Sequence, residues 1–247
     1  MLIYYSMQKV DKVLKGHHYI CFLDFEGTQF SHEMIALGAV LATLDRKGNI
    51  KRLKQSLKLY VRPKNKVGSY VTNLTGITDE KVKKDGVGFY KAMSELRNYC
   101  GSAFKKCSFM TFGNHDMRIL NQSVSYNLDV PKEVVDQIRK NYIDFTMIIG
   151  EFIRDDNGNP YSLVNYCKLF NVKEEGEAHQ PDVDAINLAH LYHAFINNNE
   201  LVLKEYLKVL AMQHHLPLPI KKATEALATG NDFSAEEFLE IAKECIS

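Results

Sequence analysis

The sequence predicts an α/β fold with a mixed sheet, and three features lead to this prediction. A short apolar run rich in aromatics, 19–25, is typical of a buried strand. A second apolar run, 34–44, ends in the turn-forming residues 45–49, and alternate apolar residues then predict a half-exposed strand over 53–61. Beyond this hairpin, helical and strand-like patterns alternate, which is typical of helices packed on a mixed sheet.

The later elements complete this outline. Short strands are expected over 108–112 and 142–145, so the predicted sheet has five strands flanked by helices. Helices are expected over 89–99, 116–126, 162–170, 182–196 and 200–213. Ser162 is a plausible cap for its helix. The 182–196 pattern is apolar on most sides, which predicts a largely buried helix.

A proline-broken segment, His215 to Pro219, divides the chain. We expect one domain over 1–213 and a short helical C-terminal extension over 214–247. Ser234 and Glu237 have the spacing of a capping box, and Gly230 suits the end of a helix. The extension is acidic on balance, which makes it a poor binder of nucleic acid but a candidate surface for a homodimer or a protein partner.

Length and composition favour an ordinary globular protein. The chain has 247 residues, with 45% hydrophobic and 25% charged side chains. No apolar run approaches the ~20 residues that span a bilayer, and residues 1–15 lack the pattern of a secretory signal. We therefore expect a soluble, cytoplasmic protein without a membrane partner. The five cysteines have spacings that suit neither zinc nor a disulfide framework.

The distribution of charge is more informative than its sum. A net charge of +1 does not mark a nucleic-acid binder. However, residues 46–66 contain many lysines and arginines and no acid. This stretch is either a solvated hairpin face that prevents sheets from associating or a positive surface for phosphates. The sequence alone leaves both interpretations open.

Two carboxylates end the first predicted strand. Asp24 and Glu26 are two positions apart, so on a strand they point to the same side. Burying them unpaired would be costly, and a cation is their natural partner. Gly27 and Thr28 follow and let the backbone turn close to a ligand. Taken alone, this motif is equally consistent with solvated acids at a strand end.

A second group of polar residues lies later in the chain. Asp116 stands where a strand passes into a helix, a common position for sites in α/β folds, although an acid also favours a helix start. Asp184 is expected within the buried helix, where an ionised carboxylate needs a partner. Asp182 is expected to cap this helix. His179, in the preceding loop, is placed to act as a general base.

The order of these motifs resembles that of the DnaQ-like exonucleases of the DEDDh type, the group of RNase T and the DNA polymerase III epsilon subunit. Residues 73–78 and 161–163 also resemble that family, and the likeness covers roughly 19–198. It looks closest to the branch of the KapD-type sporulation inhibitors and the Eri-type RNA exonucleases. Phe112 stands where the family often has tryptophan, and His115 beside Asp116 is unusual.

The resemblance implies an RNase H-like fold and hydrolysis at the 3′ end of single-stranded RNA or DNA. It implies two ions, Mg²⁺ or Mn²⁺, with Asp24 bridging both. Glu26 and Asp184 would complete one ion site and Asp116 the other, and His179 would accept the proton of the attacking water.

The resemblance also implies how the substrate is held. Gly27 and Thr28 would approach the terminal 3′-hydroxyl, and Leu74 would wedge against the terminal bases, unless it simply packs in the core. The branch favours RNA as substrate. The alternatives are a DNA exonuclease of the proofreading or repair type, and a regulatory binding module that keeps the fold.

Overall fold

The computed structural model describes residues 16–245, apart from residues 174, 177–178 and 214. The expectation for residues 1–15 therefore lies outside the described part of the chain. Within the described part, no helix is long and apolar enough to cross a membrane.

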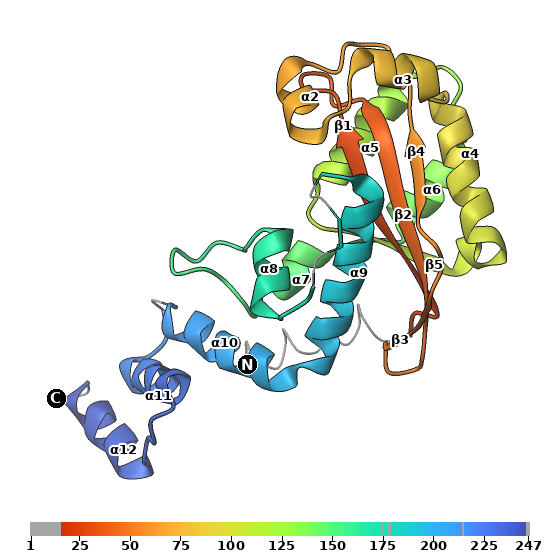
Figure 1. Ribbon diagram of the computed structural model, residues 1–247. Helices are drawn as coiled ribbons and strands as arrows, with labels where there is room; N and C mark the ends of the chain where they lie inside the picture. The colour runs from red at the N-terminus through yellow and green to blue at the C-terminus, as the bar shows by residue number, and fades with distance from the viewer. Residues whose placement is uncertain (1–15, 174, 177–178, 214, 246–247) are drawn as a thin grey trace.

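A mixed sheet of six strands forms the centre of the fold (Figure 1). Its strands are β1 (Tyr19–Gly27), β2 (Met34–Leu44), β3 (Ile50–Leu53), β4 (Leu57–Tyr60), β5 (Cys107–Thr111) and β6 (Tyr142–Asp144). Their order is β3-β2-β1-β5-β6, with β4 also paired to β2. Strands β1, β5 and β6 are parallel, and β2 is antiparallel to β1, β3 and β4. This arrangement confirms the predicted α/β class with a mixed sheet.

The prediction of five strands was wrong by one, because the expected strand over 53–61 is two strands. Both β3 and β4 pair with β2, but the Tyr99 side chain lies between them. Its hydroxyl accepts the Leu41 N–H at 3.1 Å and donates to the Gln55 carbonyl oxygen at 2.9 Å. A side chain thus takes the place of the main-chain partner and interrupts the strand.

The helices are α2 (Ser69–Thr75), α3 (Asp79–Asp85), α4 (Phe89–Cys100), α5 (His115–Tyr126), α6 (Lys132–Lys140), α7 (Phe145–Ile149), α8 (Leu163–Leu169), α9 (Pro181–Asn197), α10 (Asn199–Ala211), α11 (Leu218–Thr229) and α12 (Ala235–Glu244), with a 3₁₀ turn over Gly101–Lys106. The five predicted helices are confirmed to within two residues at each end. Ser162 caps α8 by accepting the Asn165 N–H, as expected. Helices α2, α3, α6 and α7 lie outside the predicted helical segments.

Alternate residues of β1 contribute to two separate cores. Ile20 and Phe22 pack with α7, α8, α9 and α10, whereas Cys21 and Leu23 pack with α4, α5 and α6. The sheet therefore lies between two helical layers, as Figure 1 shows for α9 in front of the sheet and α5 and α6 behind it. Since side chains alternate along a strand, the positions of Asp24 and Glu26 share the α9 face with Ile20 and Phe22.

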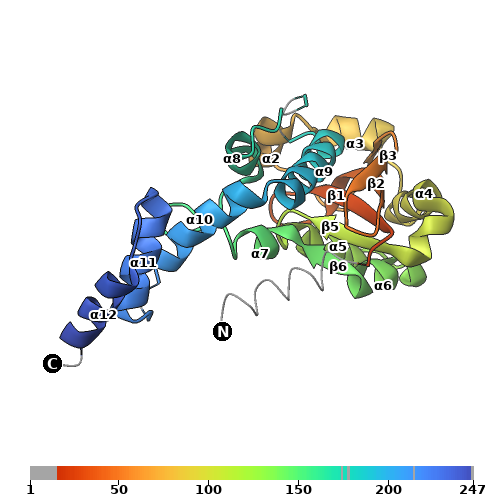
Figure 2. The same ribbon diagram turned by 90° about the horizontal axis from the view of Figure 1, so that it is seen from below.

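The C-terminal helices lead away from the sheet (Figure 2). Helix α10 still packs on the core through Val202 and Tyr206, but no residue of α12 is buried. The predicted capping box is confirmed, because Ser234 and Glu237 bond to each other's main-chain N–H. Gly230 ends α11 with a φ of 79°. The extension is thus helical, whereas its division from the domain at residue 213 stays a prediction.

Candidate active site

The first two carboxylates lie where α9 begins to cover the sheet. Asp24 pairs with Gly38 of the neighbouring strand β2. A Cβ added to Gly38 would lie 1.9 Å from the carbonyl oxygen of Pro181, the first residue of α9. The absence of a side chain at Gly38 therefore lets the first turn of α9 rest directly on the sheet beside Asp24.

This close approach brings the late motif to the early one. Suitable ligand atoms of Glu26, His179 and Asp184 all lie within 4.8 Å of one another. The His179 main-chain N–H donates to Asp184 Oδ2 at 2.8 Å, and His179 adopts a φ of 63°, in the left-handed region. That conformation is uncommon for a residue with a side chain. The predicted spacing of His179 and Asp184 therefore places both beside Glu26.

Asp182 does not cap α9, contrary to expectation. The helix begins one residue earlier, at Pro181, which suits the first helical position because it needs no N–H partner. Asp182 then falls within the first turn, and its carboxylate lies 2.9 Å from the Lys58 ammonium on β4. The residue thus serves as an ion-pair partner and not as a cap.

Asp116 approaches from the opposite side of β1. It lies in the first turn of α5, only 5% exposed, and its Oδ1 accepts the Phe25 N–H at 2.7 Å. Because parallel strands β1 and β5 end at the same edge of the sheet, the α5 start lies beside the end of β1. The hydrogen bond fixes the Asp116 carboxylate on the main chain between Asp24 and Glu26.

Burial and the charges of neighbouring acids raise the pKa of Asp24, Glu26 and Asp116. Burial, followed by the charges of Asp116, Glu26 and Asp184, raises the pKa of Asp24 well above its ordinary value. Burial, followed by Asp184 and Asp116, raises the pKa of Glu26 to about 8. Burial also raises the pKa of Asp116 to about 7, with further contributions from Asp144 and Asp184. Poorly hydrated carboxylates of like charge favour a bound cation.

Asp144 is a further acid near the site, outside the predicted motifs. It ends β6 and caps α7, where it accepts the Thr146 N–H at 2.9 Å. Its charge nevertheless raises the pKa of Asp116. Strand β6 is parallel to β5, so its end lies at the same sheet edge as the other carboxylates. Its position near the end of the predicted strand 142–145 was the feature of the sequence that could have identified Asp144 as a site residue.

The two histidines next to predicted ligands have different surroundings. The His115 ring lies edge-on to His32, with ring centroids 5.5 Å apart. Burial, followed by His32 and Arg118, lowers the pKa of His115. His179, in contrast, lies beside Glu26 and Asp184.

The predicted substrate-contacting residues differ in exposure. A Cβ at Gly27 would lie 2.8 Å from Ile119 Cγ1, so this glycine permits close packing against α5. Thr28 is 1% exposed, and its hydroxyl accepts the Glu33 N–H at 2.9 Å within the β1–β2 loop. Leu74 is 44% exposed on α2, which excludes ordinary core packing. Of these three residues, only Leu74 presents an exposed apolar side chain.

Two exposed aromatics accompany Leu74. Phe30 in the β1–β2 loop is 82% exposed, and Tyr70 on α2 is 65% exposed. Gln29 links the two segments, because its main-chain N–H donates to the Val67 carbonyl at 2.8 Å and its Oε1 accepts the Tyr70 N–H at 3.2 Å. The sequence gives no periodic pattern at Phe30 and Tyr70 from which this exposure could be predicted.

Several cations of the basic stretch bond to neighbouring groups of the protein. Lys54 donates to the Tyr99 carbonyl, Arg62 to the Gly86 carbonyl, and Lys58 pairs with Asp182. Arg46 and Lys51 line a shallow pocket at the β2–β3 turn. That turn follows Leu44, whereas Asp24 pairs with Gly38 farther back along β2, so the pocket lies toward the opposite end of the sheet.

Comparison with known proteins places the chain in a family. A family model described as an exonuclease, RNase T, matches residues 21–192. No curated protein matches the sequence significantly. The matched region contains all four acids and His179, and it ends before the C-terminal extension.

Solved structures share the fold at low sequence identity. A 3′-exonuclease in a structure of 3′-end-specific recognition of a histone mRNA stem-loop has a TM-score of 0.59 and 22% identity, over 79% of this chain and 71% of that one. The nuclease domain of 3′hExo bound to rAMP, a DEDDh member, has a TM-score of 0.56 and 21% identity, over 75% and 93%. Exonuclease I of E. coli with a dT13 oligonucleotide has a TM-score of 0.57 and 17% identity, over 78% and 44%.

These matches confirm the RNase H-like fold that the motifs implied, whereas the closer likeness to the KapD-type and Eri-type branch stays a prediction. Most of the chain, including every acid and the histidine singled out above, falls within the matched exonuclease model. The chain therefore belongs to the RNase T exonuclease family, the group of DEDDh 3′–5′ exonucleases that its motifs resemble.

Proposed function

We propose that this protein removes nucleotides one at a time from the 3′ end of single-stranded RNA, by metal-assisted hydrolysis with His179 as general base. One observation carries the proposal: side chains from three distant parts of the chain converge at the end of β1. They are Asp24 and Glu26 from the strand, Asp116 from α5, and His179 and Asp184 from the start of α9. Such a concentration of buried and partly buried acids is costly for folding alone, so a catalytic use accounts for it.

The chemistry of the four carboxylates fits hard divalent cations, Mg²⁺ or Mn²⁺, which prefer oxygen ligands. The raised pKa values of Asp24, Glu26 and Asp116 support this fit, because a cation would offset both the burial and the repulsion that raise them. When bound, two such ions would stabilise the charge that develops on the attacking and leaving oxygens of the phosphodiester. The resemblance of the motifs to the DEDDh family favours Asp24 as the ligand shared by both ions.

His179 is assigned as the base for the attacking water. Its imidazole lies near Glu26 and Asp184, on the side of the site that is formed by the loop before α9. With oxygen ligands available for the cations, the ring stays free to accept a proton. The hydrogen bond from the His179 N–H to Asp184 fixes the main chain of this residue relative to a proposed ligand.

The substrate is proposed to enter past exposed apolar side chains. Phe30, Tyr70 and Leu74 belong to the two segments that adjoin the end of β1, and each exposes much of its surface. Aromatic side chains stack on bases of single strands with little regard to sequence, and each stacked base contributes ~1–3 kcal/mol. The preference for RNA is supported by the likeness of the motifs to the Eri-type branch, and one structural neighbour recognises an mRNA stem-loop.

The test uses RNA and DNA oligonucleotides of one sequence, each labelled at the 5′ end, with Mg²⁺, Mn²⁺ or EDTA. We expect a ladder that shortens by single nucleotides, faster on RNA, and none with EDTA. Early release of labelled mononucleotide would indicate the opposite polarity, and cleavage of circular RNA would indicate an endonuclease. Either result would overturn the proposal, and faster loss of DNA would overturn the RNA preference alone.

A further inference from the structure

The main chain around His179 is held in place by contacts outside the acidic cluster. We define the His179 segment as Glu175, Gly176, His179 and Gln180. His179 itself adopts a left-handed conformation, with a φ of 63°. A residue with a side chain keeps such a conformation only where its surroundings impose it. The contacts that impose it are therefore part of how the imidazole is positioned.

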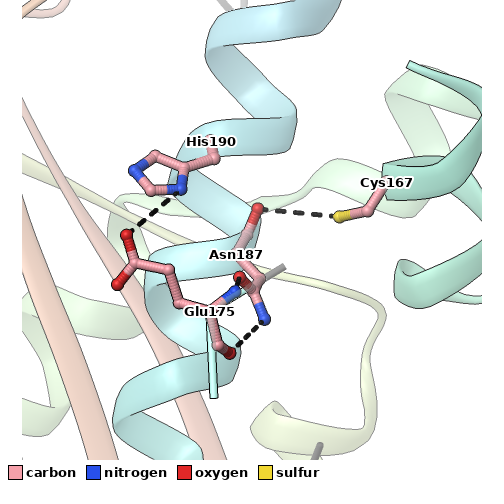
Figure 3. A network of polar contacts seen from close by, with 4 residues as sticks. All are labelled: Cys167, Glu175, Asn187 and His190. Atoms are coloured by element: carbon pink, nitrogen blue, oxygen red, sulfur yellow. Dashed lines mark hydrogen bonds and ion pairs between the residues drawn. The ribbon is translucent and has the colours of Figure 1, made fainter. Parts of the chain in front are cut away.

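The first contact comes from Asn187 on α9 (Figure 3). Its Oδ1 accepts the Glu175 N–H at 2.9 Å, and its Nδ2 donates to the Glu175 carbonyl oxygen at 3.4 Å. A carboxamide offers one acceptor and donors together, so it satisfies a residue's main chain much as a neighbouring strand would. Asn187 is only 4% exposed, which partly shields both hydrogen bonds from water.

Asn187 holds Glu175 close to α9 and close to the site. It lies three residues after Asp184, so both side chains occupy neighbouring positions on one face of the helix. A Cβ at Gly176 would lie 2.9 Å from Val183 Cγ2, so the main chain there rests directly on α9. Figure 3 also shows His190, whose Nδ1 lies 4.0 Å from the Glu175 carboxylate one turn farther along.

The second contact comes from the sheet. The Lys58 ammonium on β4 lies 2.9 Å from Asp182 Oδ1 and also donates to the Gln180 side-chain oxygen. Lys58 pairs with Gly38 of β2, and Gly38 pairs on its other side with Asp24 of β1. The Lys58 and Asp182 side chains are 26% and 24% exposed, so their ion pair is partly shielded from solvent.

We propose that Asn187 and Lys58 are positioning residues of the hydrolysis, which act through the His179 segment by holding the imidazole beside Glu26 and Asp184. The inference rests on the proposed function, and it concerns residues for which the acidic motifs assign no role. The polar contacts of both side chains described above are with this segment or with the first turn of α9. Asn187 holds the segment against α9, and Lys58 holds it against the strand edge, so the two constraints act from different sides.

The test is a set of double-mutant cycles with His179→Ala, measured as kcat and KM on labelled single-stranded RNA. Lys58→Met and Asn187→Ala should each lower kcat by ~10–100-fold with little change in KM. Displacement of a catalytic group by about 1 Å lowers the rate by about that much. In the His179→Ala background each should cost less than twofold, because the residue they position is gone. Lys58→Arg should recover most of the loss.

Matched controls are Lys91→Met and Asn197→Ala. Lys91 forms a surface ion pair with Glu95 on α4, and Asn197 donates to the His193 carbonyl at the far end of α9. Both controls should keep wild-type kcat. Equal losses in the wild-type and His179→Ala backgrounds, or wild-type kcat in Lys58→Met, would overturn the inference. If Asn187→Ala does not fold, Lys58→Met decides alone.

Amide hydrogen exchange separates this inference from the proposed function. In the peptide that spans residues 175–184, exchange should accelerate in Lys58→Met and Asn187→Ala and not in the controls. A wild-type enzyme that degrades neither RNA nor DNA would refute the proposed function, and with it a role in hydrolysis. Unchanged exchange in an active enzyme would refute the anchoring while the exonuclease assignment stands.

Discussion

Gly38 is the position where one methyl group should disturb the site most without touching any acid. A Cβ there would lie 1.9 Å from the Pro181 carbonyl oxygen, and real Cβ atoms essentially never approach another heavy atom closer than 3.0 Å. The atom in the way belongs to the main chain, so rotation of a side chain cannot relieve the clash. In Gly38→Ala, the start of α9 must therefore move from β2 by about 1.1 Å or more.

That displacement moves His179 and Asp184 away from Asp24 and Glu26. Overpacking of this kind costs ~1–3 kcal/mol of stability, which in a chain of this size lowers Tm by roughly 2–12 °C. A shift near 1 Å in a catalytic group lowers the rate by ~10²-fold. We therefore expect Gly38→Ala to remain folded at 25 °C and to lose about two orders of magnitude in kcat.

The assay is kcat on labelled single-stranded RNA at saturating Mg²⁺, with Tm from calorimetry. Gly88→Ala is the matched control, because nothing lies within 4 Å of a Cβ there and its φ of −68° suits any residue. If Gly38→Ala keeps kcat within twofold of Gly88→Ala, the start of α9 does not set the geometry of the site, and the reasoning is refuted.

Three further predictions follow from the acidic cluster and its neighbours. Asp24→Asn should abolish hydrolysis yet raise the metal-free Tm, because it removes one of several repelling charges; a kcat near wild type would contradict the metal assignment. His179→Ala should lower kcat by ~10²–10⁴-fold with little loss of Mg²⁺ affinity, whereas His115→Ala should cost far less, mainly in substrate affinity; loss of the acidic limb of the pH–rate profile in His115→Ala alone would exchange the two roles. The metal-free protein should lose stability as pH rises from about 4.5 to about 8, because the folded state binds the Glu26 proton more tightly than the unfolded chain does. Calorimetry with and without Mg²⁺ checks this prediction. The stabilisation by Mg²⁺ should grow over the same pH range.

The parts of the fold that were predictable depend on local periodicity. The apolar run over 19–25 indicated a strand that ends in Asp24 and Glu26, two positions apart and so on one face, and helical spacing located α9 to within one residue. The motifs supplied the order of the acids, and the resemblance supplied their convergence. Leu74 was identified as a candidate contact, but its exposure became clear only from the packing of α2.

The parts that could not be predicted depend on contacts between distant residues. The split of the expected strand follows from Tyr99, which lies more than forty residues beyond Gln55 in the sequence and bonds to it across the sheet edge. Asp182 matched the preferences of a helix cap, but the ion pair with Lys58 depends on the register of β4 against β2. No local pattern specifies such a register.

The site is assembled on β1 by two helices that are fixed in different ways. Helix α5 is tied from one side by the hydrogen bond from the Phe25 N–H to Asp116, which joins a ligand directly to the strand. Helix α9 is tied from the other side by packing at Gly38, which is not a ligand. Substitutions that loosen α5 therefore remove a ligand contact, whereas those that loosen α9 move His179 and Asp184 together. The first kind should weaken Mg²⁺ binding, and the second should lower kcat as well, because the base and a ligand are displaced as one unit.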